Sequence, residues 1–315
     1  MRICLLTDET IEEFNPSQHL TDYEWDLATV QRPIFEFMSE LSSRKQYDVY
    51  LNMFDGDDDD NAGFQMVCAL EKLKLAFTGA DSKCYDPSRE EMQAVAEANQ
   101  LNFARGFHAK SDLDLAQADA LNFPLIVKHP NSFASIGLTR SSRVETKEQL
   151  KEQFQITAAE FGSARVEEFI EGREVSCLVV DNPDDLSAPY AYLPAEVIFP
   201  SGETFLHEEV KWYNWDTYVV RLEDKNICER VQNASTKMFS AIGGTGYARV
   251  DLRIRPNGEL VILEINPNCG ILFYGPDDRS HADLPITWDK DGHKGFLERI
   301  FQSAILRRDI RKINS

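Results

Sequence analysis

Four polar residues near the C-terminal end of the sequence have the types and spacing of a metal-binding hairpin. Arg249 and Asp251 precede an Asn-Gly dipeptide at 257–258, and Glu264 and Asn266 follow it. Asn-Gly between two alternating apolar runs is typical of a hairpin with a two-residue type I′ turn, because that turn requires positive φ at both central residues. Such a turn places Asp251 opposite Glu264 and Arg249 opposite Asn266, with all four side chains on one face.

Two carboxylates that face each other across a hairpin need a cation between them. Directly opposed like charges destabilise a sheet, and a divalent ion removes the repulsion. Oxygen ligands from Asp251, Glu264 and Asn266 suit Mg²⁺, which keeps water and phosphate oxygens in its other positions; Mn²⁺ is the second candidate. The alternative is a solvent-facing ion network in which Arg249, Asp251 and Arg253 interact with Glu264.

Cations that suit a phosphate occur earlier in the chain. Lys128 ends an otherwise apolar run, where a buried ammonium group is costly unless an anion meets it. The loop at 131–137 contains small residues, Ser135 among them, and its backbone N–H groups could approach phosphate oxygens. Lys211 is a second candidate phosphate cation. The ordinary alternatives are a surface connection for the loop and an exposed, salt-bridging lysine for Lys211.

The segment 166–174 has features of a nucleotide-binding edge. It combines a strand end, an aromatic side chain and spaced carboxylates. An adenine could lie against its apolar side chains and hydrogen-bond to its backbone, with a carboxylate on the ribose hydroxyls. A plain connection between two strands is the alternative.

The elements that position these residues follow from the apolar pattern. The N-terminal part alternates between strand-like and helix-like runs, which predicts a small α/β unit with a parallel sheet. A second unit follows, and the chain is strand-rich from there to about Leu272. The expected strands are 1–8, 47–54, 75–78, 124–128, 166–170 and 174–180, and the expected helices are 25–41, 63–73, 88–101, 147–161 and 295–311.

Composition excludes several classes of partner. The net charge of −20 opposes contact with nucleic acid and with anionic membranes. The six cysteines show no C-x-x-C pair, which predicts reduced thiols rather than disulfides or a zinc site. No run approaches the roughly 20 apolar residues of a membrane helix, and the first apolar run is too short for a signal peptide. We therefore expect a cytoplasmic protein with small-molecule substrates, and a homodimer remains open.

Taken together in their order along the chain, the phosphate, nucleotide and metal segments described above resemble the ATP-grasp superfamily and, within it, the D-alanine–D-alanine ligase branch. The resemblance is clearest over 124–270 and fainter over 51–79. It implies an α/β (α+β) fold of three domains, with the nucleotide between the central and C-terminal domains. The implied domains are an N-terminal α/β domain at 1–82, a central ATP-grasp subdomain at 83–172, and a C-terminal subdomain with the metal and oxyanion site at 173–315.

The resemblance also implies a role for each matching residue. The implied nucleotide ligands are Lys128, Ser135 and Lys211 for phosphate, Glu167 with the backbone of Phe169 and Ile170 for adenine, and Glu174 for ribose. The implied ligands of two Mg²⁺ ions are Asp251, Glu264 and Asn266. The implied oxyanion ligands are Arg249 and the backbone N–H of Gly270.

The sequence departs from the branch at one phosphate cation. At the start of the central domain the branch usually has Asp-Lys, whose lysine grips phosphate, whereas this chain has Asp-Pro at 86–87. Lys83, Arg89 or Arg105 could replace that lysine, and the sequence does not select among them.

A second departure concerns the substrate. The N-terminal alanine-binding motifs are absent, and 271–275 replaces the position of a carboxylate-binding serine after Gly270. These differences predict an ATP- and Mg-dependent carboxylate–amine ligase that works through an acyl phosphate on amino acids or similar compounds, but not on two D-alanines. The alternatives are an acid–thiol ligase of the same superfamily and a degenerate ATP-binding protein without turnover. Cys269 is expected to pack rather than to act as a nucleophile.

Overall fold

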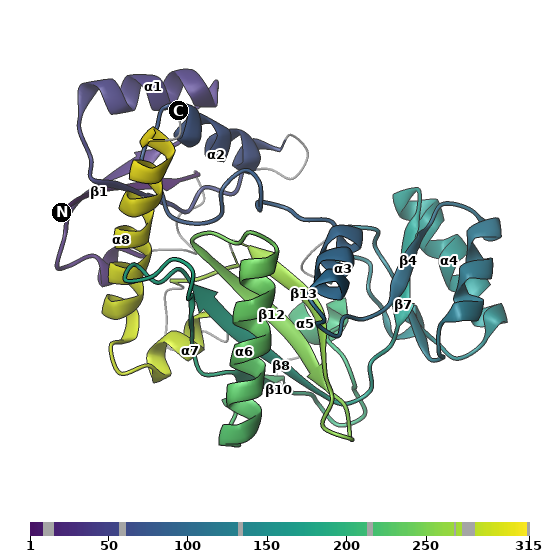
Figure 1. The fold of residues 1–315 in the computed structure, drawn as a ribbon. Helices are drawn as coiled ribbons and strands as arrows, with labels where there is room; N and C mark the ends of the chain where they lie inside the picture. Colours follow the sequence, from purple (N-terminus) through teal and green to yellow (C-terminus); the bar gives the residue numbers. More distant parts are fainter. Residues whose placement is uncertain are drawn as a thin grey trace.

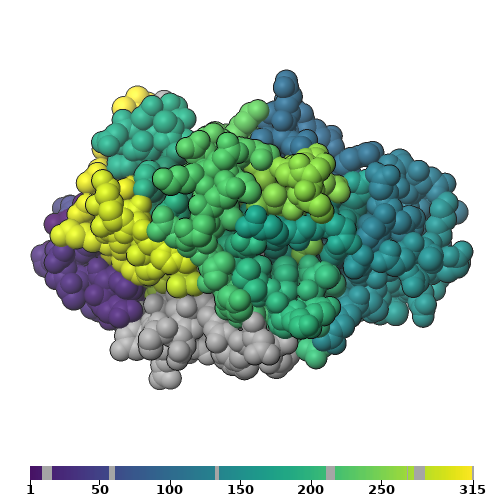
Figure 2. All heavy atoms as spheres, turned by 90° about the horizontal axis from the view of Figure 1, so that it is seen from below, coloured from purple at the N-terminus to yellow at the C-terminus, as the bar shows by residue number. Residues whose placement is uncertain are grey.

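The computed structural model describes residues 1–8, 16–56, 61–131, 135–212, 217–267, 269–272 and 281–313, without the side chains of Lys211 and Trp212. Three sheets organise these residues, and Figure 1 shows the largest of them between the other two. Figure 2 shows the second sheet and its helices, in blue to teal, as a lobe at one end of the molecule.

The first sheet is parallel and has the strand order β2-β1-β3. Its elements are β1 (Arg2–Thr7), β2 (Glu24–Thr29) and β3 (Val49–Asn52), with the helices α1 (Ile34–Arg44) and α2 (Ala62–Lys72) and the 3-10 turn η1 (Pro16–His19). The α/β unit and its parallel sheet are therefore confirmed. The expected strand at 75–78 is reduced to a single bridge between Tyr50 and Phe77.

The helix expected at 25–41 is wrong in its first half. Residues 24–29 form β2, which pairs in parallel with β1. The helix α1 begins only after Pro33, whose ring cannot occupy a helix interior because it lacks an N–H group. The apolar residues of β2 were mistaken for the first turns of that helix.

The second sheet is antiparallel and has the order β4-β7-β5-β6. Its elements are β4 (Gly106–Ala109), β5 (Leu125–Lys128), β6 (Arg143–Val144) and β7 (Ala164–Glu168), with α4 (Lys147–Phe161) and the 3-10 segments η3 (Asp112–Ala120) and η4 (Arg140–Ser142). The helix α4 has the predicted bounds. Before this sheet lies α3 (Arg89–Ala98), within the expected helix 88–101, and its N-cap residue Ser88 accepts a hydrogen bond from the N–H of Glu91.

The third sheet is antiparallel and has the order β11-β10-β8-β12-β13, with β9 beside β8. Its elements are β8 (Arg173–Val180), β9 (Tyr190–Ala191), β10 (Ala195–Ile198), β11 (Tyr218–Arg221), β12 (Tyr247–Ile254) and β13 (Leu260–Pro267), with α5 (Glu208–Trp212) and α6 (Lys225–Ala241). The sequence analysis treated this stretch as strand-rich and missed α6. That helix packs on the sheet through Val231 and Met238 and is capped by Asp224, which accepts hydrogen bonds from two backbone N–H groups.

The chain ends with α7 (Asp283–Trp288) and α8 (Gly292–Ile313), and the latter contains the predicted helix 295–311. Phe296, Ile300 and Phe301 of α8 pack in one core with Ile3 and Leu5 of β1. Figure 1 shows α8 running beside the N-terminal unit. Within the described residues, no helix has the length and apolar character needed to cross a membrane.

The β12–β13 hairpin does not have the predicted type I′ turn. The Arg255 N–H donates to the carbonyl of Glu259 at 2.8 Å, so three residues form the loop. Gly258 has a φ of 84°, whereas Asn257 keeps a negative φ. This is a type I turn followed by a left-handed glycine, and it shifts the register by one residue relative to the prediction.

A β-bulge restores the predicted pairing. Leu252 pairs with Ile262, but the next pair is Asp251 with Glu264, so Leu263 is the extra residue of the bulge. The two one-residue shifts cancel, and the predicted facing of the two carboxylates is confirmed although the predicted turn is wrong.

The three predicted domains each contain one of the sheets, but their boundaries at 82/83 and 172/173 stay a prediction. The helix α3, on the central side of the first boundary, packs its Met92 and Ala96 into the core under the third sheet. Gln93 of the same helix accepts a hydrogen bond from Arg165 of β7 at 2.6 Å, so α3 connects the second and third sheets.

A buried ion pair fixes the start of β12. Asp181 is fully buried, and its carboxylate accepts hydrogen bonds from the N–H of Gly246 at 2.8 Å and from Arg307 of α8 at 2.6 Å. Gly246 is a required glycine, since its φ is 69° and an added Cβ would lie 2.3 Å from the carbonyl oxygen of Gly79. The N-terminal unit, α8 and the strand that carries Arg249 therefore meet at one point.

Replacing Asp181 with alanine should lower the free energy of unfolding by about 3 kcal/mol, because the change leaves a partly buried guanidinium and a backbone N–H without their acceptor. Urea denaturation followed by circular dichroism measures the change. Asp309→Ala is the control, since Asp309 is exposed and pairs with its neighbour Arg308. Equal denaturation midpoints for the two variants would contradict the prediction.

Candidate active site

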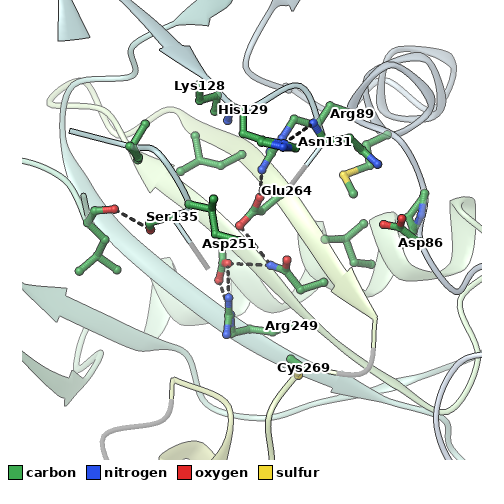
Figure 3. Close-up of a pocket in the computed structure, with 18 of the residues that line it drawn as sticks. Asp86, Arg89, Lys128, His129, Asn131, Ser135, Arg249, Asp251, Glu264 and Cys269 are labelled. Carbon is green, nitrogen blue, oxygen red and sulfur yellow. Dashed lines mark hydrogen bonds and ion pairs between the residues drawn. The ribbon is translucent and has the colours of Figure 1, made fainter. Parts of the chain in front are cut away.

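A cavity of about 510 Å³ lies where the three sheets approach one another. Its walls include Gly63 from the N-terminal unit, Arg89 from α3, Lys128 from β5 and Glu264 from β13. This volume lies within the range of sites for small molecules and cofactors. Figure 3 shows the side chains of Arg89, Arg249, Asp251 and Glu264 pointing toward a common space.

Asp251 is held by donors on three strands. Arg249 makes a two-pronged contact with its carboxylate, with both N–O distances at 2.8 Å. The Ser176 hydroxyl donates to Oδ1 at 2.7 Å, and the Asn266 amide donates to Oδ2 at 2.9 Å. The carboxylate is thus fixed in orientation at the cavity wall.

Glu264 faces a different arginine. The Arg89 Nη2 lies 2.5 Å from its Oε2, and the Asn266 amide nitrogen lies 3.3 Å from its Oε1. Burial acts to raise the pKa of Glu264, but the positive charges of Arg89, Lys128 and Arg249 outweigh burial and hold this pKa at about 2. Glu264 is therefore ionised throughout the physiological pH range.

The cations beside the facing carboxylates are Arg249 and Arg89. The alternative ion network of the sequence analysis is present only in part, because Arg253 turns away from Glu264 and pairs with Glu174 instead. Among the described residues no group of three or more histidines, cysteines or acidic residues forms a metal cluster. The oxygen ligands available to a metal ion here are the carboxylates of Asp251 and Glu264 and the amide oxygen of Asn266. Such hard oxygen ligands fit Mg²⁺, which keeps coordination positions open for water and phosphate.

Lys128 and Glu167 form an ion pair deep in the cavity, with both side chains largely buried. Burial lowers the pKa of Lys128, and nearby Arg89 lowers it further, against the opposite effect of Glu167. Burial would raise the pKa of Glu167, but Lys128 and Arg165 outweigh it, so this pKa is lowered. The sequence analysis assigned these two residues to separate parts of a nucleotide, and the structure brings them into contact.

Some of the backbone groups of Phe169 and Ile170, which are expected to bind adenine, form hydrogen bonds within the protein. The Phe169 N–H donates to the carbonyl of Pro124 at 2.9 Å, and the Ile170 carbonyl accepts from Arg253 at 2.9 Å. Arg253 also donates to Glu174 at 2.7 Å, and its guanidinium lies 5.0 Å from the centre of the Phe169 ring. The sequence analysis did not place Arg253 here, although its alternation with Arg249 and Asp251 puts it on the same face of β12.

One of the three candidates for the missing phosphate cation lies in the cavity. Arg89 lines the wall, with a side chain that is 9% exposed. Lys83 and Arg105 do not line the cavity, and the exposed Arg105 donates to the carbonyl of Ala120. The sequence could not select Arg89, because the choice depends on how α3 packs against β13.

The remaining predicted residues are placed as follows. Gly270 lines the cavity, and Ser135 lines it with its hydroxyl donating to the carbonyl of Leu206 at 2.8 Å. Residues 132–134 of the phosphate loop and the side chain of Lys211 lie outside the described part of the chain. Cys269 is buried, and burial raises the pKa of its thiol to about 12, which agrees with a packing role.

Comparison with known proteins identifies relatives of this chain. The family model described as the D-ala D-ala ligase C-terminus matches residues 93–282. A D-alanine–D-alanine ligase of Halothermothrix orenii is 31% identical over 265 residues, which cover 79% of this chain and 71% of the relative. A D-alanine–D-alanine ligase of Cupriavidus necator is 31% identical over 245 residues, which cover 75% of this chain and 70% of the relative.

Solved structures share the fold. The Bacillus anthracis D-alanine–D-alanine ligase complexed with ATP superposes with a TM-score of 0.72 at 18% identity and covers 100% of both chains. The Coxiella burnetii D-alanine–D-alanine ligase gives a TM-score of 0.70 at 17% identity and covers 99% of this chain and 96% of the other. The predicted α/β ATP-grasp fold is confirmed.

The comparisons contradict the predicted substrate. The sequence analysis excluded the joining of two D-alanines and weighed an acid–thiol ligase and an inactive ATP-binding protein, whereas the relatives carry the name D-alanine–D-alanine ligase. The exclusion relied on short loop motifs, and part of 271–275 lies outside the described residues. A missing loop motif is weak evidence against a substrate, because the motif is only part of the residues that line the cavity.

The predicted ATP-dependent C–N ligase is confirmed by the same relatives, whose named reaction forms a peptide bond. The chain belongs to the D-alanine–D-alanine ligase family of ATP-grasp enzymes.

Proposed function

We propose that the protein joins two molecules of D-alanine into a dipeptide, with ATP converted to ADP and phosphate and with Mg²⁺ bound at the hairpin. The observation that carries this proposal is the meeting of Arg249, Asp251, Glu264 and Asn266 with the cations Lys128 and Arg89 around one cavity. The names of the relatives supply the substrate.

In the proposed reaction the carboxylate of the first D-alanine attacks the terminal phosphorus of ATP. This step forms an acyl phosphate and releases ADP. The amino group of the second D-alanine then attacks the acyl carbon, loses a proton to solvent, and the carbon–oxygen bond to phosphate breaks. Catalysis of this kind depends on positioning and on the neutralisation of charge.

Asp251, Glu264 and Asn266 would hold the metal. Mg²⁺ bound there supplies positive charge to the transferring phosphoryl group. With a metal ion on these carboxylates, Arg249 and Arg89 would lose the partners that they contact in the structure. Both guanidinium groups then become available to the anionic groups of the reaction.

Arg249 and the backbone N–H of Gly270 would stabilise the oxyanion of the tetrahedral intermediate. Arg249 is anchored in β12, and Gly270 lines the same cavity after β13. Donors held on fixed elements need no reorganisation when negative charge develops on the acyl oxygen.

The nucleotide would lie between the second and third sheets. Lys128, Ser135 and Lys211 bind phosphate, Glu167 with the backbone of Phe169 and Ile170 binds adenine, and Glu174 binds ribose. Arg253 holds the Glu174 carboxylate and the Ile170 carbonyl, so it orients the base and ribose ends of this site together. A reaction that consumes ATP and free amino acids agrees with the predicted cytoplasmic location.

With ATP and Mg²⁺, D-alanine should stimulate the release of ADP and yield D-alanyl-D-alanine. A coupled assay for ADP and mass spectrometry of the product measure both. L-alanine is the matched control, and it should give no more ADP than the assay without an amino acid. No D-alanine-dependent ADP release and no dipeptide would overturn the proposed function.

Asp251→Asn and Glu264→Gln should each lower kcat by at least about a hundredfold, because each replacement removes a charged metal ligand. Glu259→Gln is the control, since Glu259 lies at the hairpin tip, pairs with Arg255 and does not line the cavity. Full activity in both cavity variants would remove the metal assignment. Circular dichroism distinguishes loss of the site from loss of the fold.

Cys269→Ala should retain kcat within about threefold of the wild type, because a buried thiol with a raised pKa is a poor nucleophile. In the wild type, iodoacetamide at pH 7.5 should leave Cys269 unmodified, as peptide mapping would show. Loss of turnover in a folded Cys269→Ala variant would contradict the packing role.

A further inference from the structure

We propose that Arg89, which pairs with Glu264 in the structure, exchanges this partner for a phosphate group of the nucleotide when a metal ion takes Glu264. This inference rests on the proposed function, since it concerns the same nucleotide site. It assigns to Arg89 the phosphate contact that the Asp-Pro dipeptide at 86–87 cannot provide.

Arg89 is presented by a rigid element. It occupies the first turn of α3, which is capped by Ser88 and anchored by Met92 and Ala96 in the core under the third sheet. Its guanidinium therefore reaches the cavity from a fixed backbone position, and only its side chain has to rotate to change partner.

The charges around Arg89 favour an anion in the cavity. Arg89 lies close enough to Lys128 to lower the pKa of that lysine, so two cations share one buried space. Glu167 neutralises Lys128, and Glu264 neutralises Arg89. When a divalent ion takes Glu264, Arg89 loses the carboxylate that it contacts directly, and nearby Glu167 is already paired with Lys128 and Arg165. The loss of a direct anionic partner is costly for a buried guanidinium. A phosphate group supplies that partner, and a guanidinium suits it because it can donate two hydrogen bonds.

The Glu264 carboxylate is the group for which Arg89 and the metal ion compete. Its side chain is 22% exposed, so a metal ion can reach it from the cavity. A metal without nucleotide must break the Arg89–Glu264 pair with no phosphate to replace the carboxylate. A nucleotide without metal must compete with Glu264 for Arg89. Nucleotide and metal therefore assist each other's binding, and the coupling is reciprocal.

Two binding measurements test the exchange in the Arg89→Gln variant. Titration calorimetry with the non-hydrolysable analogue AMP-PNP and Mg²⁺ should show an affinity loss of about tenfold to a hundredfold, as expected for a hydrogen-bonded charge. Titration with Mn²⁺ alone should show an affinity gain of at least about threefold, because no guanidinium competes for Glu264. A residue with only a structural role would not move the two affinities in opposite directions.

Arg105→Gln is the matched control, because Arg105 is an exposed arginine that lies outside the cavity. It should leave both affinities within about twofold of the wild type. Unchanged AMP-PNP binding in Arg89→Gln, or Mn²⁺ binding that weakens together with it, would overturn the inference.

Arg89→Lys covers the case in which Arg89→Gln does not fold, as judged by circular dichroism. Lysine keeps the positive charge but cannot form the bidentate hydrogen bonds of a guanidinium. The affinity for AMP-PNP should therefore fall by about threefold to tenfold. Wild-type affinity in this folded variant would overturn the inference. Both tests measure binding, so they remain decisive if D-alanine is not a substrate, and normal D-alanine turnover cannot rescue the inference if they fail.

Discussion

The site depends on two carboxylates that face each other across the β12–β13 hairpin. Asp251 and Glu264 are opposed because a bulge at Leu263 offsets the register of a three-residue turn. Facing like charges are unstable in a partly buried sheet unless cations accompany them. The structure supplies one cation from within the hairpin, Arg249, and one from α3, Arg89. The carboxylate pair is thus accompanied by cations from two different elements.

The convergence requires elements that are distant in sequence. Lys128 comes from the second sheet, Arg89 from the helix before it, and Asp251 from the third sheet. The core under the third sheet includes α3, and the core beneath β1 includes α8. Asp181 ties α8 to the start of β12. The fold thus restrains the backbone around the cavity and leaves the exchange of ionic partners to side-chain rotation.

The sequence predicted the facing of the two carboxylates correctly, because strand alternation determines it, but it gave no guide to contacts that tertiary packing determines. Alternation and a turn signal were enough to pair Asp251 with Glu264, although the turn type was wrong and the bulge compensated for it. The helix α6 was not predicted although its buried residues Cys228, Val231 and Met238 recur at helical spacing, and the apolar residues of β2 were interpreted as helical. Neither the selection of Arg89 nor the Arg253–Glu174 pair has a local signal, since each depends on contacts between separate elements. The exclusion of D-alanine failed because loop motifs are only one way to build a substrate pocket.

The pairing of each cavity cation with a carboxylate also bears on how an anionic protein binds an anionic nucleotide. The chain carries a net charge of −20, so the long-range field opposes the approach of free ATP. Lys128, Arg89 and Arg249 each pair with a neighbouring carboxylate in the structure, so these cations offer an anion little net attraction while the pairs are intact. In the proposed reaction, magnesium would reduce the charge of the arriving nucleotide and would occupy the carboxylates that neutralise the arginines. An uncomplexed nucleotide would gain neither effect, so the proposed metal site would favour the metal complex of ATP through these ion pairs.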